Sequence, residues 1–136
     1  MEQLLLHLWG DYVTQSDWMA NNKTSSHVPA LTHAVVYSLP FLLIGSWTAV
    51  AVIGITHFFI DRYRLARYVV WAKNFLAPPS EYRFHPEKAA FMRLRWQNCK
   101  NTGYPSDIPA WMSVWLMIIA DNTLHLTINY LALKYL

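Results

Sequence analysis

The chain has 136 residues, enough for one domain with a single core, and its net charge is +3. Apolar residues make up 54% of it and charged residues only 14%, whereas soluble domains carry roughly 25% charged residues. The single cysteine, Cys99, excludes an intramolecular disulfide framework and a thiolate-rich zinc site. We therefore predict that residues 1–136 form a single all-α transmembrane domain.

The first predicted helix covers residues 2–20. Its polar residues His7, Asp11 and Gln15 recur every four residues, which places them on one face of a helix. A polar run from Asn21 to Ser26 ends the pattern. We predict that this helix lies in the membrane with its polar stripe turned away from lipid.

An almost unbroken apolar pattern follows, from Pro29 to Ile60. One helix of that length would measure about 48 Å at 1.5 Å per residue, more than the roughly 30 Å of a bilayer core. We predict a break near Gly45, which gives helices over 29–44 and 46–76 arranged as a hairpin. One kinked span is the alternative.

The positive charge of the chain is concentrated after these helices. Nine of the eleven Lys and Arg residues lie between Arg62 and Lys100, which predicts that this segment is cytoplasmic. We expect a loop over 77–107, in which Glu87 to Asn98 is amphipathic and either lies on the membrane surface or packs as a short soluble helix. A last helix over 108–135 completes a bundle of about four membrane helices. The flanking apolar segments argue against a nucleic-acid partner.

Three of these helices carry a His/Asp pair with a spacing of four residues. The pairs are His7-x3-Asp11, His57-x3-Asp61 and Asp121-x3-His125, and this spacing puts both side chains of a pair on one helix face. His33 and His57 each lie twelve residues from Gly45, so a hairpin would bring them to similar depth. The predicted metal ligands are His7, Asp11, His33, His57, Asp61, Asp121 and His125.

Ionisable groups in a membrane are costly and usually face the interior of a helix bundle for a functional reason, although a single His/Asp pair is more often structural. Imidazole with carboxylate suits a transition metal, and we expect zinc, with manganese or iron as alternatives. Seven ligands exceed the four of one tetrahedral zinc site, so either two metals bind or some of the residues orient the ligands. Asp11 or Asp61 could act as general base, and Gln15 could orient ligands or substrate.

The string from His7 through Gly10 and Asp11 to Gln15, with the later His/Asp pairs, resembles an uncharacterised family of small bacterial and phage integral membrane proteins, a domain of unknown function. The resemblance covers both ends of the chain and depends mainly on the pattern His-Leu-x-Gly-Asp-x-x-x-Gln. It implies a bacterial inner membrane, or that of a phage-infected host. This family is loosely similar to membrane-bound metal-dependent hydrolases, an analogy weaker than the residue pattern itself.

Three functions are compatible with the sequence. The first is a membrane-embedded metal-dependent hydrolase whose substrate is lipid-like or carries phosphate, an anionic amphiphile taken from among membrane lipids. The second is a channel or transporter for a transition metal or protons, which would require a homo-oligomer because four helices are few for transport. The third is a non-catalytic phage membrane effector in which the His/Asp pairs are structural.

Overall fold

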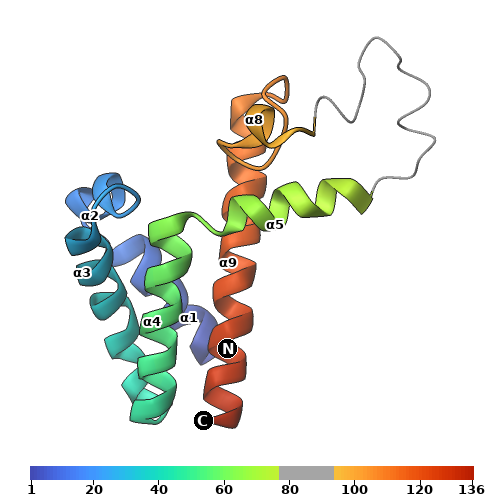
Figure 1. Ribbon diagram of the computed structural model, residues 1–136. Helices are drawn as coiled ribbons and strands as arrows, with labels where there is room; N and C mark the ends of the chain where they lie inside the picture. Colours follow the sequence, from blue (N-terminus) through green and yellow to red (C-terminus); the bar gives the residue numbers. More distant parts are fainter. Residues whose placement is uncertain (77–93) are drawn as a thin grey trace. The chain divides into compact units, whose positions relative to one another are not determined.

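The computed structural model describes residues 1–76 and 94–136, and within them the chain is helical with no β-strand, which confirms the all-α class (Figure 1). The chain divides into two compact units. Unit 1 comprises Met1–Arg64 with Asn122–Leu136, and unit 2 comprises Leu65–Asp121. The single transmembrane domain therefore stays a prediction.

Residues 2–22 form three helical segments instead of one continuous helix: α1 (Glu2–Leu8), the π-helix η1 (Trp9–Val13) and α2 (Asp17–Asn22). The break has a local cause at Ser16, whose hydroxyl accepts a hydrogen bond from the Met19 backbone N–H at 3.3 Å. Such a serine cap starts a new helix. Gln15 therefore lies in the link before α2, away from the helix that carries His7.

The apolar region folds back on itself around Gly45. α3 (His27–Ser38) continues into the 3-10 helix η2 (Leu39–Leu43), and α4 (Trp47–Tyr63) lies beside α3 (Figure 1). Pro40 has no N–H for an α-helical hydrogen bond, and the Ser46 hydroxyl caps α4 by accepting from Ala49 N–H at 3.1 Å. These residues favour a hairpin over one kinked span.

Helices α3 and α4 approach each other through small side chains. Ala34 and Ser38 of α3 are buried, and a Cβ added to Gly54 of α4 would lie 3.0 Å from the Ser38 hydroxyl. Small residues at this spacing let helix backbones pack closely, as they do between membrane helices. These small residues therefore let α3 and α4 lie close together.

The core of unit 1 is apolar and lies near the closed end of this hairpin. Tyr37, Phe41, Val50 and Ile53 are buried there with Ala49 and with Ala132 from α9 (Ala110–Tyr135). The Ser46 hydroxyl also donates to the Leu136 carbonyl at 3.0 Å. The C-terminal half of α9 is therefore an integral part of unit 1.

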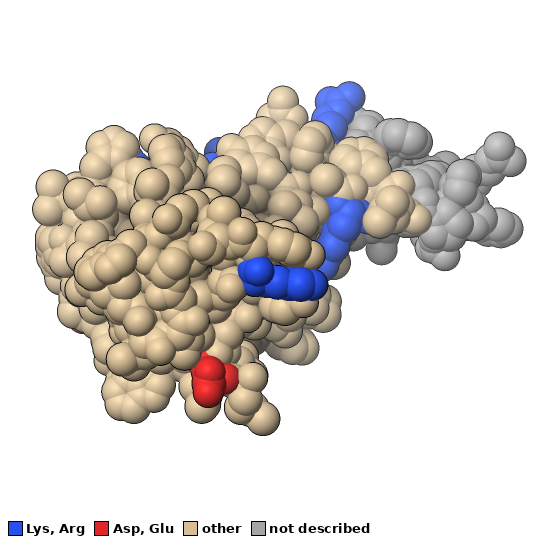
Figure 2. Space-filling view, turned by 90° about the horizontal axis from the view of Figure 1, so that it is seen from below, with Lys and Arg blue, Asp and Glu red and all other residues tan. Residues whose placement is uncertain are grey.

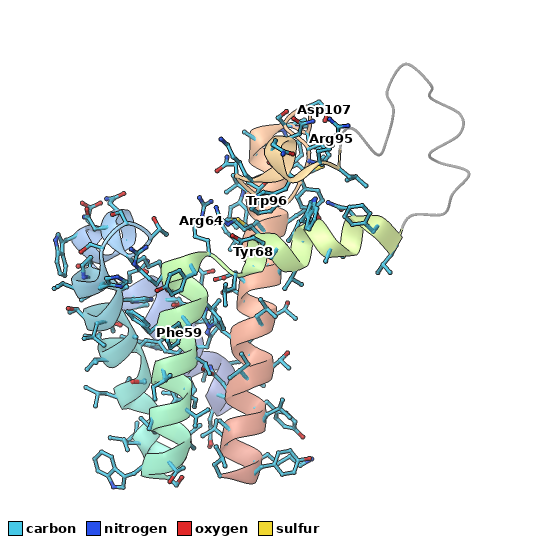
Figure 3. The ribbon with its side chains drawn as sticks, viewed as in Figure 1. Phe59, Arg64, Tyr68, Arg95, Trp96 and Asp107 are labelled. Carbon is cyan, nitrogen blue, oxygen red and sulfur yellow. The ribbon has the colours of Figure 1, made fainter. Side chains whose placement is uncertain are left out.

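Unit 2 contains α5 (Ala66–Lys73), the 3-10 helix η3 (Asn74–Leu76), α8 (Trp96–Cys99) and the first half of α9. Helix α4 ends at Tyr63, and the next residue, Arg64, has a left-handed φ of 52°, so residues 46–76 do not form one helix. Trp96 stacks on Tyr68 with ring centroids 4.6 Å apart (Figure 3). Of the predicted amphipathic segment Glu87 to Asn98, residues 87–93 lie outside the described residues.

The length and apolar character of each helix decide whether it could span a membrane. Of the helices that the structure describes, α9 alone is long and apolar enough to cross a bilayer, while His27–Leu43 is a shorter apolar stretch. Large hydrophobic side chains are nevertheless exposed on several helices, and charged residues are sparse on the face shown in Figure 2. Four membrane spans therefore stay a prediction.

Candidate metal centre

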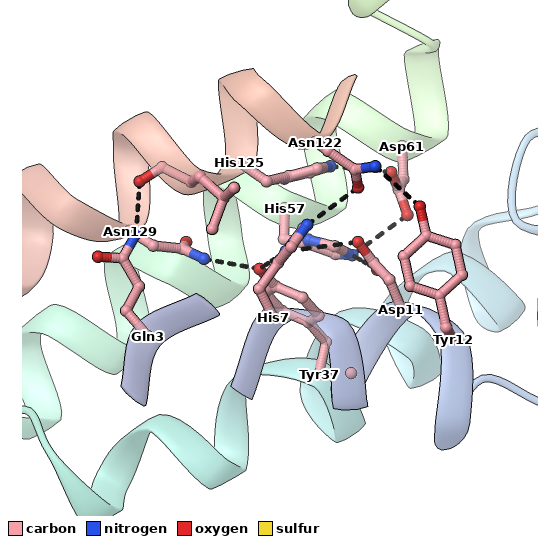
Figure 4. Close-up of polar contacts among 12 residues, drawn as sticks. Gln3, His7, Asp11, Tyr12, Tyr37, His57, Asp61, Asn122, His125 and Asn129 are labelled. Atoms are coloured by element: carbon pink, nitrogen blue, oxygen red, sulfur yellow. Dashed lines mark hydrogen bonds and ion pairs between the residues drawn. The ribbon is translucent and has the colours of Figure 1, made fainter. Parts of the chain in front are cut away.

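Two carboxylates and two imidazoles meet inside unit 1. Asp11 comes from η1, His33 from α3, and His57 and Asp61 from α4, where they are one helical turn apart. All four residues are buried, and each offers one ligand atom within 4.8 Å of the other three. Figure 4 shows Asp11, His57 and Asp61 facing one another.

The separations of these atoms are close to those in a metal site. The Nε2 atoms of His33 and His57 are 2.9 Å apart, and each lies 3.2 Å from Asp61 Oδ2. Asp11 Oδ1 is 3.2 Å from the His33 nitrogen and 3.5 Å from that of His57. Donor atoms in a tetrahedral zinc site with bonds of about 2.0–2.1 Å are about 3.3–3.4 Å apart. This buried group could therefore hold one metal ion.

Gly10 explains how Asp11 reaches the group. A Cβ at this position would collide with the ring of Tyr37, so only glycine lets η1 approach α3 this closely. The adjacent Asp11 is thereby brought against His33. The Gly-Asp pair of the first helical region thus has a steric as well as a chemical role.

Two further histidines lie behind the carboxylates. His7 Nδ1 is 3.5 Å from Asp11 Oδ2, and His125 Nε2 is 3.3 Å from Asp61 Oδ1. Each carboxylate thus turns one oxygen towards His33 and His57 and the other towards an outer histidine. Such outer partners orient metal ligands and are important for affinity.

A buried tyrosine, Tyr37, links His7 to α9. The Tyr37 hydroxyl lies 2.7 Å from His7 Nδ1 and accepts a hydrogen bond from Asn129 at 2.6 Å, while His7 Nε2 lies 2.9 Å from Asn122 Oδ1 (Figure 4). The Tyr37 ring also stacks on the His57 imidazole, with centroids 3.7 Å apart. The sequence analysis overlooked Tyr37, although it follows His33 by one helical turn.

Lys23 is a second residue that the sequence analysis overlooked as part of the site. Its Nζ donates to Asp61 Oδ2 at 2.7 Å and lies 3.5 Å from His33 Nε2. The side chain is 20% exposed, whereas that of Asp61 is 4% exposed. Lys23 is therefore more exposed than the carboxylate that it contacts. No residue spacing along the chain indicates this contact, because Lys23 and Asp61 are 38 positions apart.

The structure thus brings together four of the seven predicted ligands and places two more beside them. Asp121 lies on α9 one turn before His125, half-buried, and falls in unit 2. The side-chain oxygen of Gln15 is buried and has no hydrogen-bond partner among the described residues. The metal and catalytic roles of all these residues stay predictions.

These features define an all-helical protein with a buried group of two histidines and two aspartates suited to a metal ion. The chain belongs to the DUF3307 family of proteins of unknown function, whose sequence profile matches residues 1–92. Asp11, His33, His57 and Asp61 all lie in the matched part. No curated protein and no solved structure matches the chain.

Proposed function

We propose that this protein is a membrane-embedded, metal-dependent hydrolase acting on a lipid-like or phosphate-bearing substrate, with zinc held by His33, His57 and Asp61. The observation that carries the proposal is the convergence of two imidazole nitrogens and two carboxylate oxygens, with donor separations of 2.9–3.5 Å. Two imidazoles and one carboxylate form the ligand set of several catalytic zinc sites, which leaves a fourth position for water or substrate. Manganese or iron would suit the same donors.

A divalent ion in this position would stabilise negative charge on a carbonyl or phosphoryl oxygen and activate water. Asp11 is the natural general base. Its side chain, 10% exposed, is the most accessible of the four, and its Oδ1 lies 3.2 Å from His33 Nε2, next to the metal position. A carboxylate beside the open position can accept a proton from water.

The distribution of apolar surface supports a membrane location. An apolar groove with a volume of about 380 Å³ runs between α3 and α4, and Leu31, Val35, Ile55 and Phe59 line it with the small residues already described. Phe59 is 47% exposed. Such a groove can accept an acyl chain, which supports a lipid-like substrate. A bacterial inner membrane, with the basic segment in the cytoplasm, is part of the proposal.

The experiment is a hydrolysis assay on protein purified in a mild detergent, stripped of metal and reloaded with zinc. We expect release of phosphate or fatty acid from a panel of phospholipids and lipid phosphates only after reloading. Asp11→Asn should lose turnover while it retains zinc, and Glu2→Gln, at an exposed carboxylate, serves as the matched control. A zinc-loaded wild type with no activity across the panel would contradict catalysis.

A second candidate is a non-catalytic membrane protein that the metal stabilises. Four protein donors at tetrahedral spacing can close a site, as in structural zinc centres. The burial of all four residues favours this candidate. It predicts that zinc raises the unfolding temperature and that no substrate is turned over, so the same assay separates the two functions.

A further inference from the structure

We propose that Lys23 forms an anion-binding subsite beside the metal position and receives a phosphate group of the substrate. This inference rests on the proposed function and specifies its substrate class. The ammonium is close enough to the ligand group to contact a molecule bound to the metal, since its Nζ lies 2.7 Å from Asp61 Oδ2. Its side chain is 20% exposed, more than those of Asp11 and Asp61.

The hydrogen-bonding capacity of Lys23 leaves room for a ligand. An ammonium has three N–H donors. One is directed at Asp61 Oδ2, and the ammonium also lies 3.5 Å from His33 Nε2, whose lone pair a bound metal would take. A remaining donor is available to an oxygen of a bound anion, which would then bridge Lys23 and the metal position.

The charge balance favours an anion once a metal is present. Asp11 and Asp61 contribute two negative charges, a divalent metal two positive charges, and neutral imidazoles none. Lys23 then adds one positive charge that nothing in the ligand group compensates. Because a buried or half-buried charge without a partner is costly, an anionic ligand stabilises the loaded site. Without metal, Lys23 instead pairs with Asp61, so anion binding should depend on metal.

The segment around Lys23 is held in position by Arg62. Its guanidinium donates to the carbonyls of Thr24 at 2.6 Å and Ser25 at 3.2 Å, and its Nε donates to His27 Nδ1 at 3.3 Å. The arginine fork, which often binds phosphate, is therefore already engaged by the protein. Arg62 acts as a positioning residue, and Lys23 is left as the anion receptor.

The test measures binding of inorganic phosphate to zinc-loaded protein in neutral detergent by calorimetry. Lys23→Met should weaken phosphate binding tenfold or more with zinc content unchanged, and Lys23→Arg should recover part of it. Lys134→Met is the matched control, because Lys134 lies over the rings of Tyr130 and Tyr135 at the end of α9. If Lys23→Met does not fold, Lys23→Gln takes its place. Removing zinc from the wild type should abolish phosphate binding.

A second arm uses a short-chain phosphatidate in mixed micelles to distinguish the source of the phosphate. Binding at least tenfold tighter than that of inorganic phosphate, and dependent on Lys23, assigns the subsite to a lipid headgroup; equal binding assigns it to free phosphate. Equal phosphate affinity in wild type and Lys23→Met, or no binding of either probe by the zinc-loaded wild type, overturns the inference alone. Failure of the wild type to bind any metal overturns the proposed function as well.

Discussion

The two faces of the α3–α4 hairpin have opposite chemical character. The inner face carries His33, His57 and Asp61, all buried in the polar group. The outer face carries Leu31 and Ile55, which are more than half exposed, and contains the apolar groove. A soluble protein turns apolar residues inward and polar residues outward. This contrast, in a hairpin whose core is otherwise apolar, is consistent with the proposed lipid contact outside and metal ion inside.

The largest effect should come from the inner face. His57→Ala or Asp61→Asn removes a donor and leaves an incomplete set, so we expect zinc affinity to fall more than about a hundredfold, beyond the range typical of outer partners. Competition with a chromophoric zinc chelator measures this change. Glu2→Gln, at an exposed carboxylate, should bind zinc like the wild type. An unchanged zinc affinity in Asp61→Asn would contradict metal binding by the inner face.

The outer face can be tested with a charge. Ile55→Lys places an ammonium on the surface that we assign to lipid, where insertion scales give a cost of about 2.5–3.5 kcal/mol at mid-membrane. We expect much less protein in the carbonate-resistant membrane fraction. Thr48→Lys, at the exposed first turn of α4, should have little effect. Equal membrane recovery of both variants would contradict a lipid-facing hairpin.

A smaller effect sharpens the division between ligands and outer partners. His7 contacts Asp11 through the oxygen that faces away from His33 and His57. His7→Ala should therefore lower zinc affinity by about 10–100-fold, as loss of an outer partner does. The same chelator competition measures it. A loss as large as that of His57→Ala would show that His7 is itself a ligand.

The smallest expected effect concerns packing next to the inner face. Gly10→Ala forces a methyl group against the Tyr37 ring, and such overpacking costs about 1–3 kcal/mol. Denaturant unfolding in detergent measures the change, with Leu8→Ala, an exposed neighbour, expected within about 0.5 kcal/mol of the wild type. A wild-type stability for Gly10→Ala would contradict the close approach of η1 to α3.

Part of the site could be predicted from the sequence because helical spacing is local. His57 and Asp61 lie on one continuous helix, so their four-residue spacing places them together. The equal distances of His33 and His57 from Gly45 also predict their meeting once the chain turns there. Asp11 was predicted from its place on one continuous helix over residues 2–20, which the structure divides into segments. Its observed position depends on the π-helix η1 and on Gly10.

The remaining features depend on tertiary contacts that no periodicity reveals. Lys23 reaches Asp61 across 38 residues, and Tyr37 meets Asn129 across 92. The helix caps at Ser16 and Ser46 are local sequence signals. The cap at Ser16 was missed because a helical pattern of polar and apolar residues continues across it. Helix class was therefore predictable, whereas the contacts of Lys23 and Tyr37 in the site required the fold.

The most direct test of the central claim, that Asp11, His33, His57 and Asp61 form one metal centre, is zinc analysis combined with X-ray absorption at the zinc edge on the purified protein. The account predicts one zinc per chain with four nitrogen and oxygen donors at about 2.0–2.1 Å, two of them imidazoles. It also predicts that Asp61→Asn loses this signal. Substoichiometric zinc in the wild type, or a donor shell without imidazole, would contradict it.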